Sequence, residues 1–214
     1  MKQLTTYNRT VQYLTKVFKL INAEYFNGNL EQPTITVQST LRAYGHLTVS
    51  KVWKNENGNA TYELNISADY LNRPIDYIVA TLIHECCHLY NLMNGIQDTS
   101  NNGVYHNKRF KEIAEKAGLI VERHPRYGWT VTSPSEETIR FCLDNGLREI
   151  LCTRNAGYSF IGIGTDKAAS GSPAPAKKKS NSIKWVCPCC GAIIRSTKQI
   201  NVICGDCGVK FEQA

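Results

Sequence analysis

The segment His84-Glu85-Cys86-Cys87-His88 constrains this chain more than any other part of its sequence. It lies within residues 73–94, where apolar residues recur at three- and four-residue steps, so a long helix is predicted there. Four residues apart on a helix, His84 and His88 project from the same face and can bind one zinc ion. Glu85 lies roughly 100° around the helix from His84, where it can accept a proton from a metal-bound water molecule. The pattern predicts zinc chemistry with Glu85 as general base.

A catalytic zinc ion needs a third protein ligand and one open coordination position. His46, His106 and His124 are the remaining histidines. His106 precedes a short predicted helix, and a loop of about 11 residues can fold the start of that helix back over the first one. We therefore predict His106 as the third ligand, with Glu112 or Glu115 as the carboxylate alternative. His124 is expected to be an exposed loop residue.

The two cysteines inside the motif are expected to pack in the interior. Cys86 points away from the two histidines on the predicted helix and should belong to the core. Cys87 flanks the site on the side opposite Glu85, and we interpret it as a small packing residue. Neither is predicted to be a metal ligand or a nucleophile.

A second metal site is predicted in the C-terminal region. Cys187-Pro188-Cys189-Cys190-Gly191 and Cys204-Gly205-Asp206-Cys207-Gly208 each contain Cys-x-x-Cys followed by Gly, and 13 residues separate the two pairs. Such knuckles supply four thiolates to a tetrahedral structural zinc ion, without which about 30 residues cannot hold a core. The repeated spacing favours four ligands and leaves Cys189 outside the set. These ligands are Cys187, Cys190, Cys204 and Cys207.

The remaining elements predict an α+β fold. Further helices are expected over residues 5–27, 107–117 and 135–145, the last with Ser135 as its N-cap. Short strands are expected over residues 35–37, 44–49 and 62–67, and residues 119–132 are expected to be extended. The predicted architecture is a small antiparallel sheet packed with helices around the zincin-type His-Glu-x-x-His helix, followed by a zinc ribbon.

The composition changes sharply near residue 154, where Gly, Ala, Ser, Pro and Lys begin to dominate. Such a segment has little to bury and is typical of a linker. We therefore predict a metalloprotease-like domain over residues 1–153, a flexible basic linker over residues 154–183 and a four-cysteine ribbon over residues 184–214.

Positive charge is concentrated in the same C-terminal part. Residues 167–214 contain eight Lys or Arg and two acidic residues, which accounts for +6 of the total net charge of +7. A basic tail suits a polyanion, and we predict nucleic acid as the partner of this region. Trp185 and Phe211 are its aromatic residues that can stack on bases. The alternative is a tail that only adds solubility.

The sequence argues against membrane association and secretion. No run approaches the roughly 18 apolar residues of a membrane-spanning helix. The N-terminus has no apolar signal-peptide core. The nine cysteines are odd in number and unevenly placed, unlike a disulfide framework. We expect no membrane partner and a reducing, cytoplasmic location.

The order of these features resembles the SprT-like family of zinc metalloproteases, which includes Spartan. The likeness rests on the N-terminal amphipathic helix, the small sheet, the His-Glu-x-x-His helix, Gly103 and His106 followed by Phe110, and the C-terminal ribbon. It covers residues of roughly 5–120 and 184–212. The resemblance implies His84, His88 and His106 as zinc ligands and Glu85 as catalytic base. It also implies a link to DNA, because the best-studied eukaryotic members are DNA-dependent proteases that cut proteins crosslinked to DNA.

Together these features predict a zinc-dependent metalloprotease that acts on protein substrates, associates with nucleic acid and attacks DNA-bound proteins. It should carry one catalytic and one structural Zn²⁺. The alternative is a nucleic-acid-binding zinc-ribbon protein with an inactive protease-like domain, against which the intact Glu85 argues. A metal-dependent hydrolase of another substrate, such as an amide, is a further alternative.

Overall fold

The computed structural model describes residues 4–40, 43–154 and 183–213. The chain divides into two compact units, Met1–Tyr158 and Ser159–Ala214, which are described separately below. Of the predicted linker, residues 155–182 lie outside the described residues. No helix in the described ranges is long and apolar enough to cross a membrane. The α+β class is confirmed by helices and small sheets in the first unit and a small sheet in the second.

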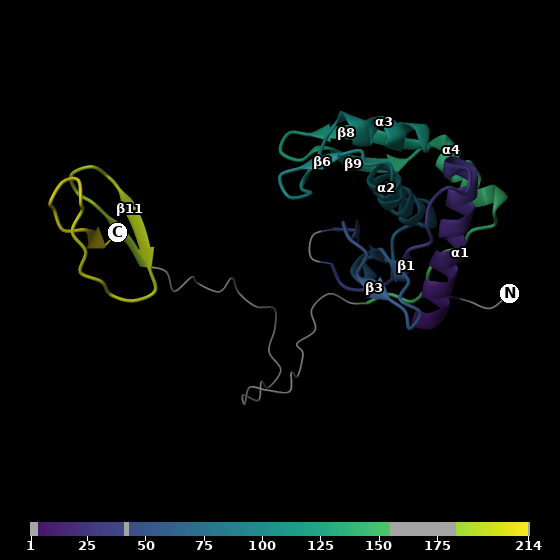
Figure 1. The fold of residues 1–214 in the computed structure, drawn as a ribbon, viewed down its shortest axis with the longest axis horizontal. Coiled ribbons are helices and arrows are strands. Elements are labelled where there is room, and N and C mark those ends of the chain that lie inside the picture. Colours follow the sequence, from purple (N-terminus) through teal and green to yellow (C-terminus); the bar gives the residue numbers. More distant parts are fainter. Residues whose placement is uncertain (1–3, 41–42, 155–182, 214) are drawn as a thin grey trace, which may run out of the picture. The chain divides into compact units, whose positions relative to one another are not determined.

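Helix α2 (Ile75–Met93) forms the centre of the first unit and carries the His-Glu-x-x-His motif. In Figure 1 it lies between β6, β8 and β9 on one side and β1 and β3 on the other. It packs against α1 (Tyr7–Phe26), α3 (Lys108–Lys116) and α4 (Glu136–Asp144). Because α2 is surrounded in this way, most of its side chains are buried, including the polar residues Thr81, Glu85 and Asn91.

The first sheet has the strand order β1-β5-β2. Its strands are β1 (Thr34–Thr36), β5 (Glu63–Ile66) and β2 (Gly45–Leu47). β2 and β5 are antiparallel as predicted, but β1 and β5 are parallel, so the prediction of a wholly antiparallel sheet was wrong. Alternation of apolar residues reports which face of a strand is buried and not the direction of its neighbour. β2 is left as an edge strand.

A short hairpin and a single helical turn complete this region. The hairpin is formed by β3 (Trp53–Lys54) and β4 (Ala60–Thr61), and the predicted turn over residues 55–59 is its tip. The 3-10 helix η1 (Ala68–Tyr70) follows β5 and leads toward α2. The hairpin therefore forms part of the connection between β2 and β5.

The second sheet has the order β6-β7-β9-β8. Its strands are β6 (Thr99–Ser100), β7 (Tyr105–His106), β9 (Gly128–Pro134) and β8 (Leu119–His124). The β8–β9 hairpin confirms that most of residues 119–132 are extended. The two-residue strands β6 and β7 were not predicted, because segments so short carry no readable periodicity.

Gly128 allows the second sheet to reach His106. Its backbone φ is +72°, and a Cβ atom there would lie 2.1 Å from the carbonyl oxygen of His106. The amide of His106 also donates to the carbonyl of Tyr127 at 3.0 Å. Since any side chain at residue 128 would collide with this backbone, glycine is required for β9 to fix the position of His106.

The predicted starts of the two later helices are confirmed. The Asn107 side chain caps α3 by accepting hydrogen bonds from the amides of Arg109 and Phe110. The hydroxyl of Ser135 caps α4 by accepting from the amide of Thr138 at 3.3 Å. Each cap satisfies amide groups that have no partner within the helix. The predicted helix bounds differ from the observed ones by one or two residues.

The second unit is a small three-stranded sheet with a minimal core. Its strands are β10 (Ile183–Val186), β11 (Ile193–Ser196) and β12 (Glu212–Gln213), in the order β11-β10-β12. Both pairs are antiparallel. Trp185 and Phe211 are buried together with Cys187 and Cys204, and the indole of Trp185 donates to the hydroxyl of Ser196 at 3.0 Å.

Candidate metal centres

Three histidines from two distant segments meet above Phe110. The Nε2 atoms of His84 and His88 are 3.2 Å apart, those of His84 and His106 3.2 Å, and those of His88 and His106 3.0 Å. The Phe110 ring is fully buried, and its centroid lies 4.5–4.7 Å from the centroids of all three imidazole rings. The structure thus brings together the three predicted histidine ligands.

The geometry of the three nitrogens fits a zinc ion. The Nδ1 atom of His88 lies 2.7 Å from the carboxylate of Asp98, which can only accept, so Nδ1 carries the hydrogen and Nε2 of the neutral ring presents a lone pair. Three mutually close nitrogens cannot all be satisfied by hydrogen bonds to one another. Two ligands on a tetrahedral zinc with bonds of about 2.0–2.1 Å would lie about 3.3 Å apart. The observed separations are close to that value.

The surroundings also favour the uncharged form of His84 and His106. Burial, reinforced by the nearness of the other two histidines, lowers the pKa of His84 well below its usual value. Burial lowers the pKa of His106 to about 4. Neutral imidazole is the form that binds a metal ion, so this environment suits the histidines to a ligand role.

Asp98 is a residue of this site that sequence reasoning missed. It is buried, and its carboxylate accepts hydrogen bonds from His88 and, at 3.0 Å, from the side-chain amide of Asn91. Burial alone would raise the pKa of Asp98, but these hydrogen bonds outweigh it and the pKa is lowered. Its carbonyl accepts from the amide of Asn107 at 2.9 Å, which ties His88 to the segment that carries His106. A buried carboxylate partner is typical of metal-binding histidines, but no fixed spacing reveals it in a sequence.

The Glu85 carboxylate lies beside the edge strand of the first sheet. Its side chain is nearly buried and makes no hydrogen bond to another described residue, and burial raises its pKa to about 7. A Cβ atom on Gly45 would lie 3.2 Å from Oε1 of Glu85 and 2.8 Å from the carbonyl oxygen of Asn65. The absence of a side chain at Gly45 therefore leaves room for this carboxylate between β2 and α2.

A cavity of about 1080 Å³ opens over these side chains. Residues 43–49, which include β2, line one wall, and part of β9 with the segment 95–106 lines another. Among the described residues that line it, Glu85 and Asp98 are the only ones that carry a formal charge, apart from histidines. The arrangement offers a buried carboxylate and a nitrogen-ligand metal site to a molecule in an open cavity.

The other candidate ligands do not join the histidine cluster. His46 and His124 line the cavity but lie outside the three-histidine cluster, and the His124 ring stacks on Tyr127 with centroids 4.7 Å apart. Glu112 is exposed, and Glu115 pairs with Lys111 at 2.7 Å on α3, so neither alternative carboxylate joins His84 and His88.

The two cysteines of the motif are fully buried, as expected for packing residues. Burial raises the pKa of both the Cys86 and the Cys87 thiol well above the usual value. Such thiols stay protonated at neutral pH and are inert.

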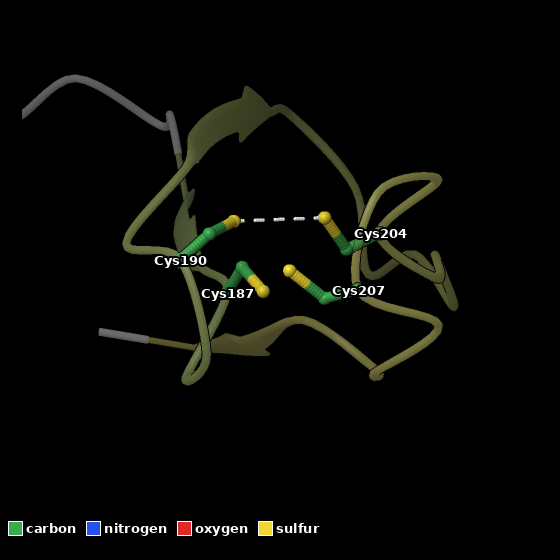
Figure 2. A group of neighbouring side chains, drawn as sticks. All are labelled: Cys187, Cys190, Cys204 and Cys207. Carbon is green, nitrogen blue, oxygen red and sulfur yellow. Dashed lines mark hydrogen bonds between the residues drawn. The ribbon is translucent and has the colours of Figure 1, made fainter.

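The four predicted ribbon cysteines converge from two knuckles, as Figure 2 shows. The Sγ atoms of Cys190 and Cys204 are 3.7 Å apart, close to the roughly 3.8 Å between two thiolates on a tetrahedral zinc with 2.3 Å bonds. The knuckles match, because the amide of Gly191 donates to the carbonyl of Cys187 and that of Gly208 to the carbonyl of Cys204. Cys189 is exposed and lies outside the group of four.

Comparison with known proteins yields one family. The family model described as "SprT-like family" matches residues 14–131, which is more than half of the chain. The matched part contains all three clustered histidines and Glu85 but not the ribbon. No curated protein and no solved structure matches the chain.

Proposed function

Because the chain belongs to the SprT-like family, we propose that it is a zinc-dependent metalloprotease that hydrolyses peptide bonds in protein substrates. The observation that carries the proposal is the convergence of three imidazole nitrogens, 3.0–3.2 Å apart, beside a nearly buried carboxylate in an open cavity. An inactive protease-like domain would have no need to retain that carboxylate, so the alternative of a purely nucleic-acid-binding protein is less well supported.

To hydrolyse a peptide bond, the protein would hold a zinc ion through the Nε2 atoms of His84, His88 and His106. When bound, zinc would supply a Lewis acid that lowers the pKa of water toward neutral pH and polarises a carbonyl group. Glu85 accepts the proton of the water that attacks the peptide carbonyl carbon, and then donates it to the leaving amine nitrogen. The unpaired edge of β2 along the cavity wall presents main-chain groups to which an extended peptide can hydrogen-bond.

The direct test is hydrolysis of an unfolded protein such as casein by the zinc-loaded chain. Fragments should appear, their formation should stop when a chelator removes the metal, and it should return when zinc is added. Hydrolysis that is indifferent to the chelator would contradict the proposal.

Asp98 should strengthen zinc binding without touching the metal. Replacing it by Ala removes the acceptor that fixes the orientation of the His88 ring, and loss of such a partner typically weakens metal affinity about 10- to 100-fold. Competition with a chromogenic chelator measures this change.

Asp144→Ala is the matched control, because Asp144 is exposed at the end of α4. It should leave the zinc affinity unchanged. Equal affinities of the Asp98→Ala and wild-type proteins would show that the carboxylate does not support His88.

We also propose that the basic C-terminal region binds nucleic acid. Lys184 and Arg195 are direct cross-strand neighbours on β10 and β11. Like charges placed opposite each other destabilise a strand pair, so phosphate groups beside them would stabilise it. Trp185 and Phe211, the aromatic residues of this region that could stack on bases, are both buried and not available for stacking. Binding should therefore depend on phosphate contacts, with no preference for single strands.

The double variant Lys184→Ala/Arg195→Ala should bind DNA several-fold more weakly than the wild type, and its affinity should fall less steeply with salt, because fewer counterions are released. Fluorescence anisotropy at two salt concentrations measures both effects.

Lys16→Ala/Lys19→Ala removes the same charge from exposed positions on α1 and serves as the control. Equal losses in the two double variants would mean that only net charge matters. Unchanged binding in the first would exclude the ribbon hairpin as the contact.

A further inference from the structure

The floor of the cavity is a stripe along α2. Thr81, His84, His88 and Leu92 line it at three- and four-residue steps, which places them on one face of the helix. The 11 residue steps from Thr81 to Leu92 rise about 16 Å, which matches about five residues of extended peptide. A bound substrate thus places residues from both sides of the cut bond in the cavity.

Beyond His88 the lining contains apolar side chains beside the polar Gln97, Asp98 and Thr99. Leu92 follows His88 by one helical turn on the same face, and Ile96 lies just after the end of the helix. Val104, in the turn that precedes β7, also lines the cavity. Three apolar side chains that follow His88 in the sequence therefore line the cavity that contains the metal site.

The charged groups among the described lining residues favour an apolar side chain over an acidic one. Among the described residues, no Lys or Arg lines the cavity. Its two acidic residues are Glu85, which serves as the base, and Asp98, whose Oδ2 atom bonds to His88 and Asn91, and both would repel an acidic side chain. Burial of an unpaired charge is unfavourable, whereas burial of an apolar side chain is favourable.

We propose that Leu92, Ile96 and Val104 form a subsite that receives an apolar side chain of the substrate next to the cut bond and rejects an acidic one. This inference rests on the proposed proteolytic function and narrows its substrates to extended protein segments with an accessible apolar residue at the cleavage point.

The test begins with digestion of a defined peptide mixture by the zinc-loaded chain and identification of the cut bonds by mass spectrometry. One position beside the cut bond should be dominated by Leu, Phe and other apolar residues. In matched peptides that vary only at this position, kcat/KM should be about 100-fold higher for Leu than for Asp.

Substitution of one lining residue should change the preference. Val104 is 52% exposed, so Val104→Lys is compatible with folding, and it should raise cleavage of the Asp peptide relative to the Leu peptide at least about tenfold. Val52→Lys is the matched control, because Val52 is 55% exposed and lies outside the cavity lining. It should leave the ratio unchanged.

A binding measurement separates failure of the subsite from failure of the proposed function. The zinc-loaded Glu85→Gln protein should bind the Leu peptide more tightly than the Asp peptide in fluorescence anisotropy, whether or not turnover occurs. Cleavage with no preference, or equal affinity for the two peptides, overturns the subsite. Absence of cleavage of every peptide by the wild type counts against proteolysis, and the affinities then decide on the subsite alone.

Discussion

Replacing Glu85 by Gln will abolish peptide hydrolysis while the protein keeps its full zinc content. Gln has nearly the same shape but cannot accept the proton of the attacking water, and general-base catalysis typically contributes about 10²- to 10⁴-fold to the rate. The three imidazoles are untouched by the change, and Glu85 makes no hydrogen bond to another described residue, so the metal site should survive. Rates of casein or peptide cleavage, measured beside elemental analysis, test both halves of this expectation.

Glu112→Gln provides the control, because Glu112 is an exposed glutamate on α3 outside the histidine cluster. It should retain both activity and zinc. A Glu85→Gln protein with wild-type activity would exclude Glu85 as the base. Loss of zinc in the Glu112 variant would instead point to a carboxylate ligand.

The purified chain will contain about two zinc ions that can be removed one at a time. His88→Ala should lose the ion of the histidine site, and Cys204→Ser should lose the ion of the ribbon. Loss of this ion should unfold the ribbon. In the described residues, its buried core consists of Trp185, Phe211 and two of the cysteines, and so small a core cannot hold a fold without the metal. Elemental analysis gives the metal count, and hydrogen exchange over residues 183–196 reports unfolding of the ribbon.

Cys189→Ser is the matched control for the ribbon, since Cys189 is exposed and lies outside the group of four cysteines. It should leave about two zinc ions and the exchange pattern unchanged. A content of one ion that does not respond to Cys204→Ser would defeat the ribbon assignment. Loss of protease activity in Cys204→Ser would show that the two units depend on each other.

The sequence by itself determined the features in which spacing along the chain fixes geometry. The helical period places His84 and His88 on one face of α2 and turns Cys86 into the core. The repeated Cys-x-x-Cys spacing likewise selected the four cysteines that converge in the ribbon. Helix caps such as Ser135 were readable for the same reason, because a cap acts within three residues of its own position.

Tertiary structure decided everything that depends on the approach of distant segments. His106 lies 18 residues from His88, and its place beside that ring depends on β9, which can approach only because residue 128 is Gly. The parallel pairing of β1 with β5 and the burial of Trp185 were also decided at this level.

The roles of Asp98 and Gly45 were likewise decided only by the tertiary structure. Asp98 reaches His88 from a loop whose path no sequence spacing predicts. Gly45 matters only because the Glu85 carboxylate and the Asn65 backbone occupy the space where its side chain would stand. Short-range periodicity is imposed by the backbone hydrogen bonds of one element, whereas clearance between elements depends on how all the side chains pack. The sequence therefore determined which residues can bind metal, and only the packed structure decided which carboxylates, walls and cavity surround them.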